Sequence, residues 1–504
     1  MRCLRATTST GPDGIPNILL KKLCGQLALP LSHIFTISFN SQQVPDDWKH
    51  AHVKPLFKNG VASDPNNYRP ISLTSTCCRV MERIINKELI DYLLDKSLVS
   101  KEQHGFIRRR STCSNLLECL QDWMLSIDNK RITDVIYIDF KKAFDQVSHN
   151  KLLLKLNSYG ITGDLYGWIK SFLSNRTQAV KLDGCLSSVI AILSGVPQGS
   201  VLGPILFVLF INDLVDSFKN LAVSTKLFAD DLKLYTSYGL TDSSCDLTEA
   251  LNRVTVWAKK WQLTINSTKC NVLRIVNPRC KNKSDIVYDL NGSSLKVLSV
   301  VKDLGVAVDK NLRFDNHISS VVHKSLQRAN LILKCFQSRD RSLLMKAFKV
   351  YVRPLLEYAT PVWSPHFMYL ILKIEHVQRS FTKRLFGLKN LTYIDRLKQL
   401  EIDTLEHRRL IYDLCTCFKI IHGYNDTCLD MNRMHLEGRP NNTRGHNLKL
   451  AKEMCRTDML RFFFCNRICT VWNSLPLDVV NAPSVNSFKK RVSKFNLDRF
   501  LTLE

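Results

Sequence analysis

Residues 226–235 read Lys226-Leu227-Phe228-Ala229-Asp230-Asp231-Leu232-Lys233-Leu234-Tyr235, two short apolar stretches on either side of a pair of carboxylates. The apolar residues predict two strands, and the polar pair between them predicts the tip of a hairpin. Taken alone, an Asp-Asp pair at such a tip indicates turn chemistry, because Asp accepts hydrogen bonds from its own backbone there.

A third carboxylate changes this interpretation. Asp139 directly follows Val135–Ile138, which is predicted to be a buried strand. An unpaired buried carboxylate is costly, so Asp139 needs a partner. If the two strands are neighbours, Asp139 and Asp230 can share hard divalent cations. The pattern suits two Mg2+ ions, with Mn2+ as a possible substitute, because Mg2+ prefers oxygen ligands and keeps coordination positions for substrate phosphates.

The loop Gly195-Val196-Pro197-Gln198-Gly199-Ser200 precedes an apolar helix predicted over Val201–Leu214. Gly195 and Gly199 allow the backbone to come close to a ligand, and Gln198 offers donors and an acceptor between them. A Gly-Pro loop before a helix is by itself only a loop. Its position between Asp139 and Asp230 makes it a more specific signal.

The remaining pattern predicts an α+β fold. Apolar residues at helical spacing predict helices over Arg79–Lys96 and Leu247–Leu263, and a strand is predicted over Cys270–Val276. After about residue 311 strand signals become rare and basic helices follow. Residues 311–400 hold 16 Lys or Arg against 5 Asp or Glu, which favours a face that follows nucleic acid over an ordinary solvated surface.

Composition narrows the class of protein. The chain has 71 Lys plus Arg against 45 Asp plus Glu, a net charge of +26 that favours a polyanionic partner. The longest apolar run, Pro204–Ile211, is too short to span a membrane, and the N-terminus has no apolar signal core. The 17 cysteines include no C-x2-C pair and are predicted to be reduced. A cytoplasmic and nuclear location is expected.

These blocks together resemble the polymerase of non-LTR (LINE-type) retrotransposons, in particular the jockey-like group. The likeness runs from Gly11-Pro12-Asp13-Gly14 to beyond Leu304-Gly305-Val306, and more loosely to about residue 400. It is carried by the loop at 195–200, the carboxylate pair and three further blocks: Asn67–Leu73 (NYRPISL), Gln103–Phe106 (QHGF) and Asp139–Asp145 (DFKKAFD).

The resemblance implies a right-hand polymerase that closes on a template-primer duplex. It implies fingers and the N-terminal part of the polymerase at 1–130, a palm with an antiparallel sheet at 131–310 and a basic helical thumb at 311–400. Residues 401–504 are predicted to be helical, without an assigned role. The implied activity is that of an RNA-directed DNA polymerase, which extends a DNA primer on an RNA template with dNTPs.

The resemblance also implies roles for single residues. Asp139 and Asp230 would ligate both metal ions, with Asp231 in support. Phe144 matches the aromatic residue under the sugar of the incoming nucleotide, where a bulky ring excludes a 2′-hydroxyl. The alternative for Phe144 is core packing. Gln198 is expected to contact the dNTP.

Three basic residues are expected near the triphosphate. Arg69 matches the fingers arginine that grips it, since a guanidinium bonds two phosphate oxygens. Lys58 is a companion or a solvated loop lysine. Lys269 matches the lysine proposed to protonate the pyrophosphate leaving group, or is a surface lysine. Gly305 lies in a turn like the primer grip, and it is expected to face the template-primer together with Gly195 and Gly199.

The sequence also departs from the family pattern. Relatives carry an endonuclease upstream, whereas the likeness here begins inside the first polymerase block, so no endonuclease is expected in this chain. Ile107 and Arg109 replace the usual Arg and Gly of the fingers block. These departures leave an inactive remnant that binds nucleic acid as the alternative function. An RNA-dependent RNA polymerase is disfavoured by Phe144, and a maturase or telomerase by the 67–73 block.

Overall fold

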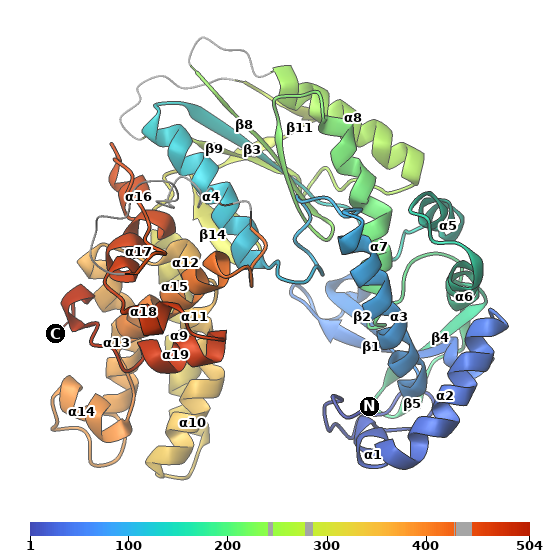
Figure 1. The fold of residues 1–504 in the computed structure, drawn as a ribbon, viewed down its shortest axis with the longest axis horizontal. Coiled ribbons are helices and arrows are strands. Elements are labelled where there is room, and N and C mark those ends of the chain that lie inside the picture. Colours follow the sequence, from blue (N-terminus) through green and yellow to red (C-terminus); the bar gives the residue numbers. More distant parts are fainter. Residues whose placement is uncertain (240–244, 278–285, 428, 430–445, 504) are drawn as a thin grey trace.

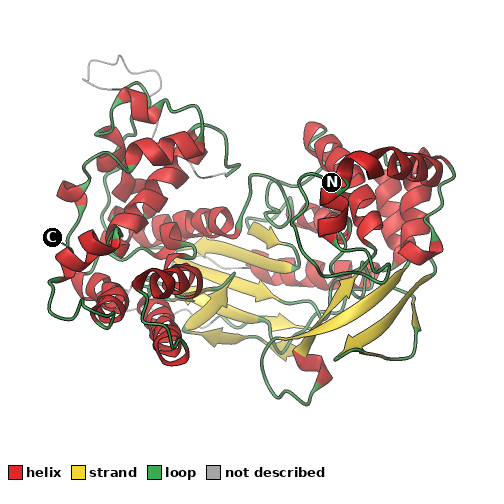
Figure 2. Cartoon of the chain, turned by 90° about the horizontal axis from the view of Figure 1, so that it is seen from below, coloured by secondary structure: helices red, strands yellow, loops and turns green. Residues whose placement is uncertain are grey.

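The computed structural model describes residues 1–239, 245–277, 286–427, 429 and 446–503. A central sheet lies between two bodies that are mainly helical, one built from the N-terminal part of the chain and one from the C-terminal part (Figure 1). Figure 2 shows the strands running through the middle of the molecule with helices on both sides. The predicted mixture of strands and helices is therefore observed.

The N-terminal body contains a second five-stranded sheet. Its first elements are α1 (Asn17–Lys22), α2 (Cys24–Asn40), η1 (Asp46–Trp48), β1 (His50–Phe57), η2 (Pro65–Asn67), β2 (Tyr68–Leu73) and α3 (Thr76–Asp95). The next helix, α4 (Thr112–Asp128), packs instead with the helices of the C-terminal body. Later residues return to the N-terminal body as α5 (His149–Ser158), α6 (Gly163–Leu173), β4 (Arg176–Leu182), β5 (Cys185–Leu186) and β6 (Ile190–Ile192). The strand order is β2-β1-β4-β5, with β1 and β4 parallel and β6 paired to β4.

The central sheet has the order β12-β9-β3-β8-β7. Its strands are β3 (Ile132–Ile138), β7 (Ser224–Phe228), β8 (Asp231–Tyr238), β9 (Asn271–Ile275) and β12 (Lys296–Leu298). Strand β3 pairs antiparallel with both β8 and β9, with Ile138 opposite Leu232 and Tyr137 opposite Asn271. Neighbouring helices are α7 (Gly203–Ile211), η3 (Asn212–Phe218) and α8 (Cys245–Trp261), and the short strands β10 (Asp289–Leu290), β11 (Ser293–Ser294), β13 (Val300–Asp303) and β14 (Val306–Asp309) follow.

Both faces of this sheet are buried, and six of the seven residues of β3 are buried, including the polar Thr133 and Asp134. Val135 packs on the side of α4, whereas Ile136 and Ile138 pack on the side of α7 and α8. The alternation follows the two-residue period of a strand. The sheet thus separates the two large hydrophobic clusters of the described residues.

The predicted helix over Val201–Leu214 is shorter in the structure. Helix α7 begins at Gly203 and passes into the tighter η3 at Asn212. The carboxylate of Glu82, which is fully buried on α3, accepts hydrogen bonds from the backbone N–H of Val201 at 2.7 Å and of Leu202 at 3.0 Å. This side chain therefore satisfies donors just ahead of the helix and fixes where it begins.

The C-terminal body consists of helices from residue 315 onward, as predicted. They are α9 (Asp315–Cys335), α10 (Arg341–Tyr351), α11 (Arg353–Glu357), α12 (Thr360–Trp363), α13 (Met368–Lys383), α14 (Tyr393–Leu400), α15 (Leu405–Ile421), α16 (Asp458–Arg461), α17 (Phe464–Asn473), α18 (Leu477–Val480), α19 (Val485–Val492) and η5 (Asp498–Phe500). One hydrophobic cluster joins α9 and α13 to α15, α17 and α19 and reaches α4. Residues after 401 thus share a core with residues 311–400, and the predicted domain boundaries stay a prediction.

Candidate active site

The carboxylates predicted to converge lie together at one end of the central sheet. Asp139 follows β3 directly, and the β7–β8 hairpin places Phe228 opposite Asp231 with Ala229 and Asp230 in the turn. Because Ile138 lies opposite Leu232, Asp139, the residue that follows β3, reaches the level of this turn. The residues that the sequence separates by about ninety positions therefore share one end of the sheet.

The charges of these carboxylates act on one another's pKa values. Partial burial raises the pKa of Asp230, and the negative charge of Asp139 raises it further, while Arg69 and Lys58 oppose the shift. Desolvation and the charges of Asp230, Asp303 and Asp139 raise the pKa of Asp231 to about 7. Such shifts mark a site where negative charges crowd and a cation would be favourable.

Asp139 has polar partners on the segment between α8 and β9. The side-chain amide of Asn266 donates to the carboxylate of Asp139 at 3.1 Å, and the backbone N–H of Asn266 donates to the Asp139 carbonyl at 2.8 Å. The ammonium of Lys269 lies 3.8 Å from the same carboxylate, and its side chain is 69% exposed. Lys269 is thus close to the carboxylates yet free to move. Asn266 received no role from the sequence.

The carboxylate oxygens suit a hard divalent cation. Among the described residues, no group of three His, Cys, Asp or Glu side chains is arranged to hold a metal ion by itself. Asp139 and Asp230 nevertheless lie close enough for the charge of one to raise the pKa of the other, and Asp231 feels both. The donor set fits ions that complete their coordination with phosphate oxygens and water.

The 195–200 loop packs against the Asn67–Leu73 block. The backbone N–H of Ser72 donates to the Gln198 carbonyl at 2.7 Å, and the Gln198 side-chain amide donates to Asp145 at 2.8 Å. A Cβ at Gly199, where φ is +122°, would lie 2.4 Å from the Ser72 carbonyl oxygen. A Cβ at Gly195 would lie 2.8 Å from Asp145 Cα. In this structure both glycines allow close approach of the chain's own backbone, and their template-primer role stays a prediction.

Phe144 packs against other aromatic rings, and its role in selecting the sugar stays a prediction. Its ring stacks on Phe207 of α7 with centroids 4.2 Å apart, and Phe106 meets its edge at 6.2 Å. The side chain is nevertheless only partly buried. Phe144 is therefore a braced aromatic ring with an accessible surface, and its carbonyl accepts the backbone N–H of Val196 in the 195–200 loop at 2.9 Å.

Arg69 and Lys58 lie on the β1–β2 hairpin, where Leu56 pairs with Arg69 and the backbone N–H of Lys58 donates to the Asn67 carbonyl at 2.8 Å. Both side chains are exposed. Their charges nevertheless act on Asp230, lowering its pKa against the effect of burial. The structure thus brings both predicted basic residues within electrostatic reach of the carboxylates.

The turn between β13 and β14 is held by a residue from the C-terminal body. Leu304 and Gly305 adopt positive φ values of 44° and 91°. The hydroxyl of Tyr358 donates to the Leu304 carbonyl at 2.8 Å, and its ring would lie 3.1 Å from a Cβ at Gly305. A side chain at Gly305 would therefore be strained by the positive φ and tight against the Tyr358 ring, and the template-primer role of Gly305 stays a prediction.

His317 braces the same hairpin and gives a pH-dependent prediction. Its Nδ1 accepts from the Ala307 N–H at 3.2 Å, and burial, assisted by the charges of Lys324 and Lys302, lowers its pKa to about 4. Between pH 6.5 and about 4 the unfolded chain binds the extra proton, so His317 costs stability as the pH falls through this window. We expect the melting temperature of His317→Phe to approach or exceed that of the wild type on acidification from about pH 7 to about pH 4.5.

The exposed His323 of the same helix provides the control. His323→Phe should leave the difference in melting temperature from the wild type independent of pH. If the melting-temperature differences of His317→Phe and His323→Phe from the wild type changed equally with pH, the loss of stability in acid would not come from His317.

Several residues of the site escaped the sequence interpretation. Asn266 contacts Asp139, and Asp145 contacts Gln198. Lys233 and Asp303 form a buried ion pair at 2.9 Å. Asp145 is the last residue of the block Asp139–Asp145, and membership of that block was its only signal in the sequence. Lys233 received no role from the sequence.

Comparisons with known proteins agree with this geometry. Residues 56–308 match the family described as "Reverse transcriptase (RNA-dependent DNA polymerase)". The "Probable RNA-directed DNA polymerase from transposon BS" of Drosophila melanogaster is 30% identical over 382 residues, covering 72% of this chain and 41% of that protein. The "RNA-directed DNA polymerase from mobile element jockey" of the same species is 29% identical over 387 residues, covering 75% of this chain and 42% of that protein. The chain thus spans about two fifths of the length of these relatives.

A solved structure of apo telomerase from Candida tropicalis, truncated from its C-terminal domain, superposes with a TM-score of 0.38 at 14% identity, covering 57% of this chain and 59% of that chain. A superposition this loose adds nothing to the assignment. The family match over the palm-like sheet and the observed architecture confirm the predicted α+β, right-hand fold. Within the described ranges, no helix is both long and apolar enough to cross a bilayer.

Proposed function

Because the chain belongs to the reverse transcriptase family, we propose that it is an RNA-directed DNA polymerase that extends a DNA primer on an RNA template with dNTPs. The observation that carries this proposal is the convergence of Asp139 with Asp230 and Asp231 at one end of the central sheet. The family generally uses divalent metal ions. A cytoplasmic and nuclear location stays a prediction.

We assign the metal site to Asp139 and Asp230, with Asp231 in support. Two Mg2+ ions bound there would stabilise the attacking primer oxygen and the leaving pyrophosphate oxygen during in-line phosphoryl transfer. Asn266 orients the Asp139 carboxylate by donating to it, which leaves the other carboxylate oxygen available. We assign proton delivery toward the leaving group to the exposed Lys269, whose ammonium lies 3.8 Å from the Asp139 carboxylate.

The surrounding residues suit the other substrates. Arg69 and Lys58 present exposed cations on a hairpin beside Asp230, as binding a triphosphate requires. The C-terminal body exposes Lys324, Arg328 and Lys334 along α9, and such side chains neutralise backbone phosphates without reading bases. We therefore propose an RNA template and a DNA primer as the nucleic-acid partners.

Primer extension tests the proposal. Purified protein receives an RNA template, a labelled DNA primer, dNTPs and Mg2+, with omission of Mg2+ as the blank. Mg2+-dependent extension is the expected result. Binding of the template-primer that weakens steeply with salt, without any synthesis, would replace the proposal with the alternative of a nucleic-acid-binding remnant. Equal use of rNTPs and dNTPs would favour an RNA polymerase instead.

Phe144→Val tests how the sugar is selected. The stack on Phe207 holds the Phe144 ring rigidly, so a 2′-hydroxyl that meets it cannot be accommodated cheaply. Removing the ring should lower the preference for dNTP over rNTP by about 10- to 100-fold, since steric discrimination in a pocket is worth about 1–3 kcal/mol. The measurement is the ratio of kcat/KM values for dCTP and CTP, which differ only at the 2′ position of the sugar.

The matched control is Phe172→Val, which makes the same change in a fully buried ring of α6. It should lower the melting temperature and leave the sugar preference unchanged. A Phe144→Val enzyme with the wild-type ratio would assign Phe144 to core packing alone.

A further inference from the structure

The turn that carries Asp230 is held by the side chain of Gln103. Gln103 Oε1 accepts the backbone N–H of Ala229 at 3.0 Å and the N–H of Gly105 at 2.7 Å. Its Nε2 donates to the Ala229 carbonyl at 3.4 Å. One amide thus contacts both backbone groups of the residue before Asp230, although 126 positions separate the two along the chain.

Ala229 needs such support. Its φ is +57°, in the left-handed region, which costs a residue with a Cβ roughly 1–2 kcal/mol. The residue is also buried, so its backbone N–H and carbonyl have no access to bulk water. Gln103, which is itself fully buried, satisfies both groups and makes the strained conformation the stable one. The direction in which the chain enters Asp230 follows from that conformation.

The segment that carries Gln103 is fixed along the edge of the hairpin. The backbone N–H of Leu227 donates to the Glu102 carbonyl and the N–H of His104 donates to the Leu227 carbonyl, both at 2.9 Å. Gly105 then passes so close to Ala229 that a Cβ would lie 2.3 Å from the Ala229 nitrogen. Residues 102–105 therefore run against β7 and its turn with no space between them.

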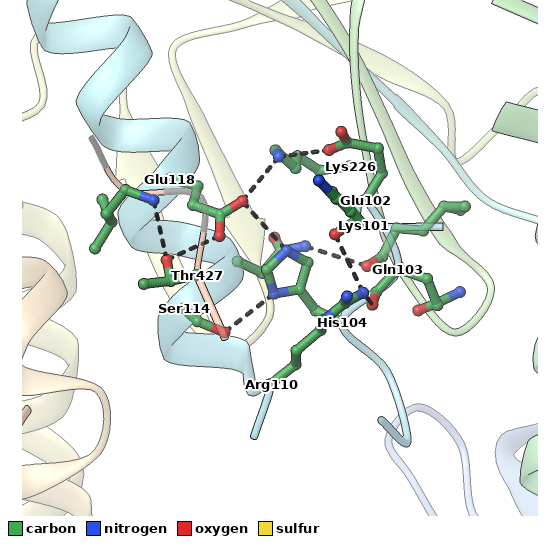
Figure 3. A network of polar contacts seen from close by, with 12 residues as sticks. Lys101, Glu102, Gln103, His104, Arg110, Ser114, Glu118, Lys226 and Thr427 are labelled. Carbon is green, nitrogen blue, oxygen red and sulfur yellow. Dashed lines mark hydrogen bonds and ion pairs between the residues drawn. The ribbon is translucent and has the colours of Figure 1, made fainter. Parts of the chain in front are cut away.

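A buried polar network anchors the same segment (Figure 3). Lys226 of β7 lies 2.5 Å from Glu102 and 2.8 Å from Glu118 of α4, and Glu118 lies 3.3 Å from the ring of His104. His104 Nδ1 contacts the Ser114 hydroxyl at 3.0 Å. Burial disfavours the charge on Glu118, yet His104 and Lys226 outweigh it and lower the pKa of Glu118 well below its usual value. The ion pairs keep Gln103 from moving away from the turn.

We infer that Gln103 is a positioning residue that sets the metal affinity of the proposed polymerase site by holding the Ala229 peptide. This inference rests on the proposed function, because the role of Asp230 as metal ligand belongs to that proposal. Gln103 does not touch substrate or metal. Its effect reaches the site through the orientation of one peptide, and a misplacement of about 1 Å there is enough to reduce turnover roughly 100-fold.

Gln103→Met tests the inference, because methionine keeps the length of the side chain and removes both hydrogen-bonding groups. We expect kcat for primer extension to fall about 10- to 100-fold and the Mg2+ concentration for half-maximal activity to rise several-fold. Ala229→Gly in the same chain should recover part of the loss, since glycine adopts a positive φ without strain. If the role of Gln103 were purely structural, Gln103→Met would leave the Mg2+ dependence unchanged and Ala229→Gly would not restore activity.

Gln378→Met is the matched control. Gln378 is equally buried on α13 and donates to the Tyr393 hydroxyl and the Asp403 carbonyl, far along the chain from the hairpin. It should lower the melting temperature and leave the Mg2+ dependence at the wild-type value. If Gln103→Met fails to fold, Gln103→Asn provides the same comparison, because its amide is too short to reach Ala229.

A binding measurement separates this inference from the proposed function. Mn2+ alone is titrated into each protein, and free Mn2+ is followed by electron paramagnetic resonance. Weaker Mn2+ binding by Gln103→Met than by Gln378→Met supports the inference even if the wild type shows no synthesis, a result that would overturn the proposed function only. Wild-type synthesis with identical metal dependence in all three proteins would overturn the inference only.

Discussion

Asp230→Asn is expected to reduce Mg2+-dependent primer extension by about 1,000-fold while the protein stays folded. Asparagine has the shape of aspartate but carries no charge, so it removes one ligand from the proposed metal site. Charge stabilisation by a bound ion is worth several kcal/mol in the transition state, and ~4 kcal/mol corresponds to roughly three powers of ten in rate. The measurement is single-turnover extension of a labelled primer.

The stability of this variant distinguishes loss of chemistry from loss of structure. Burial and the charge of Asp139 raise the pKa of Asp230, so its ionised form is disfavoured in the folded protein. Neutral asparagine relieves that penalty, and without divalent ions the melting temperature should stay the same or rise. Adding Mg2+ should stabilise the wild type more than the variant, because a ligand stabilises only the state that binds it.

Asp216→Asn provides the control for charge removal. Asp216 is an exposed carboxylate on η3 whose ion-pair partner is the exposed Lys219. It should keep wild-type extension and the wild-type response to Mg2+. An Asp230→Asn protein with more than about a tenth of wild-type activity would exclude Asp230 as a metal ligand.

The sequence predicted the strand ends well, because periodicity and terminal carboxylates are local signals. Val135–Ile138 read as a buried strand and lies within β3, and the hairpin at 226–235 is observed as β7 and β8. Once both strands belong to one sheet, Asp139 must come near Asp230. The resemblance to a known family then gave these positions chemical roles that periodicity alone cannot supply.

The parts that could not be predicted depend on contacts between distant segments. Nothing near Gln103 indicates that its amide reaches Ala229, and nothing near Ser72 indicates that it binds the Gln198 carbonyl. A polar residue in a loop looks the same whether it faces water or another loop. The sequence predicted that the glycines let the backbone approach a ligand. In the structure Gly199 lets the backbone approach the Ser72 carbonyl oxygen.

Lys233 lies within a strand, and its contacts with distant segments could not be predicted either. Its substitution gives the second large expected effect, a loss of stability. The alternation Leu232-Lys233-Leu234 suggests that Lys233 faces solvent, yet its side chain is 2% exposed. Its ammonium donates to Asp303 at 2.9 Å and to the Asn115 side chain at 2.6 Å. Burial opposes the charge on Lys233, but the Asp303 carboxylate outweighs it and raises the pKa of Lys233. The pair joins β8 to β13 and α4.

Lys233→Met is therefore expected to lower the free energy of unfolding by about 3–5 kcal/mol, the range found when one partner of a buried ion pair is removed. Most of this loss comes from Asp303, which is 4% exposed and would be left without its cation. The double variant Lys233→Met with Asp303→Asn should regain much of the stability, because no buried charge remains. Equilibrium unfolding in urea measures all three proteins.

Lys219→Met removes a lysine from an exposed pair of similar length, the 2.8 Å contact with Asp216, and should cost less than about 1 kcal/mol. If the free energy of unfolding fell no more in Lys233→Met than in Lys219→Met, Asp303 would not be an uncompensated buried charge in the variant. The double variant adds a second distinction. Asp303 raises the pKa of Asp231 and Lys233 lowers it, and the double variant removes both charges. The net charge beside the carboxylates therefore stays the same, and Mg2+ activation should match that of the wild type once stability is restored. A large loss of Mg2+ activation at restored stability would show that the pair also fixes the geometry of the site.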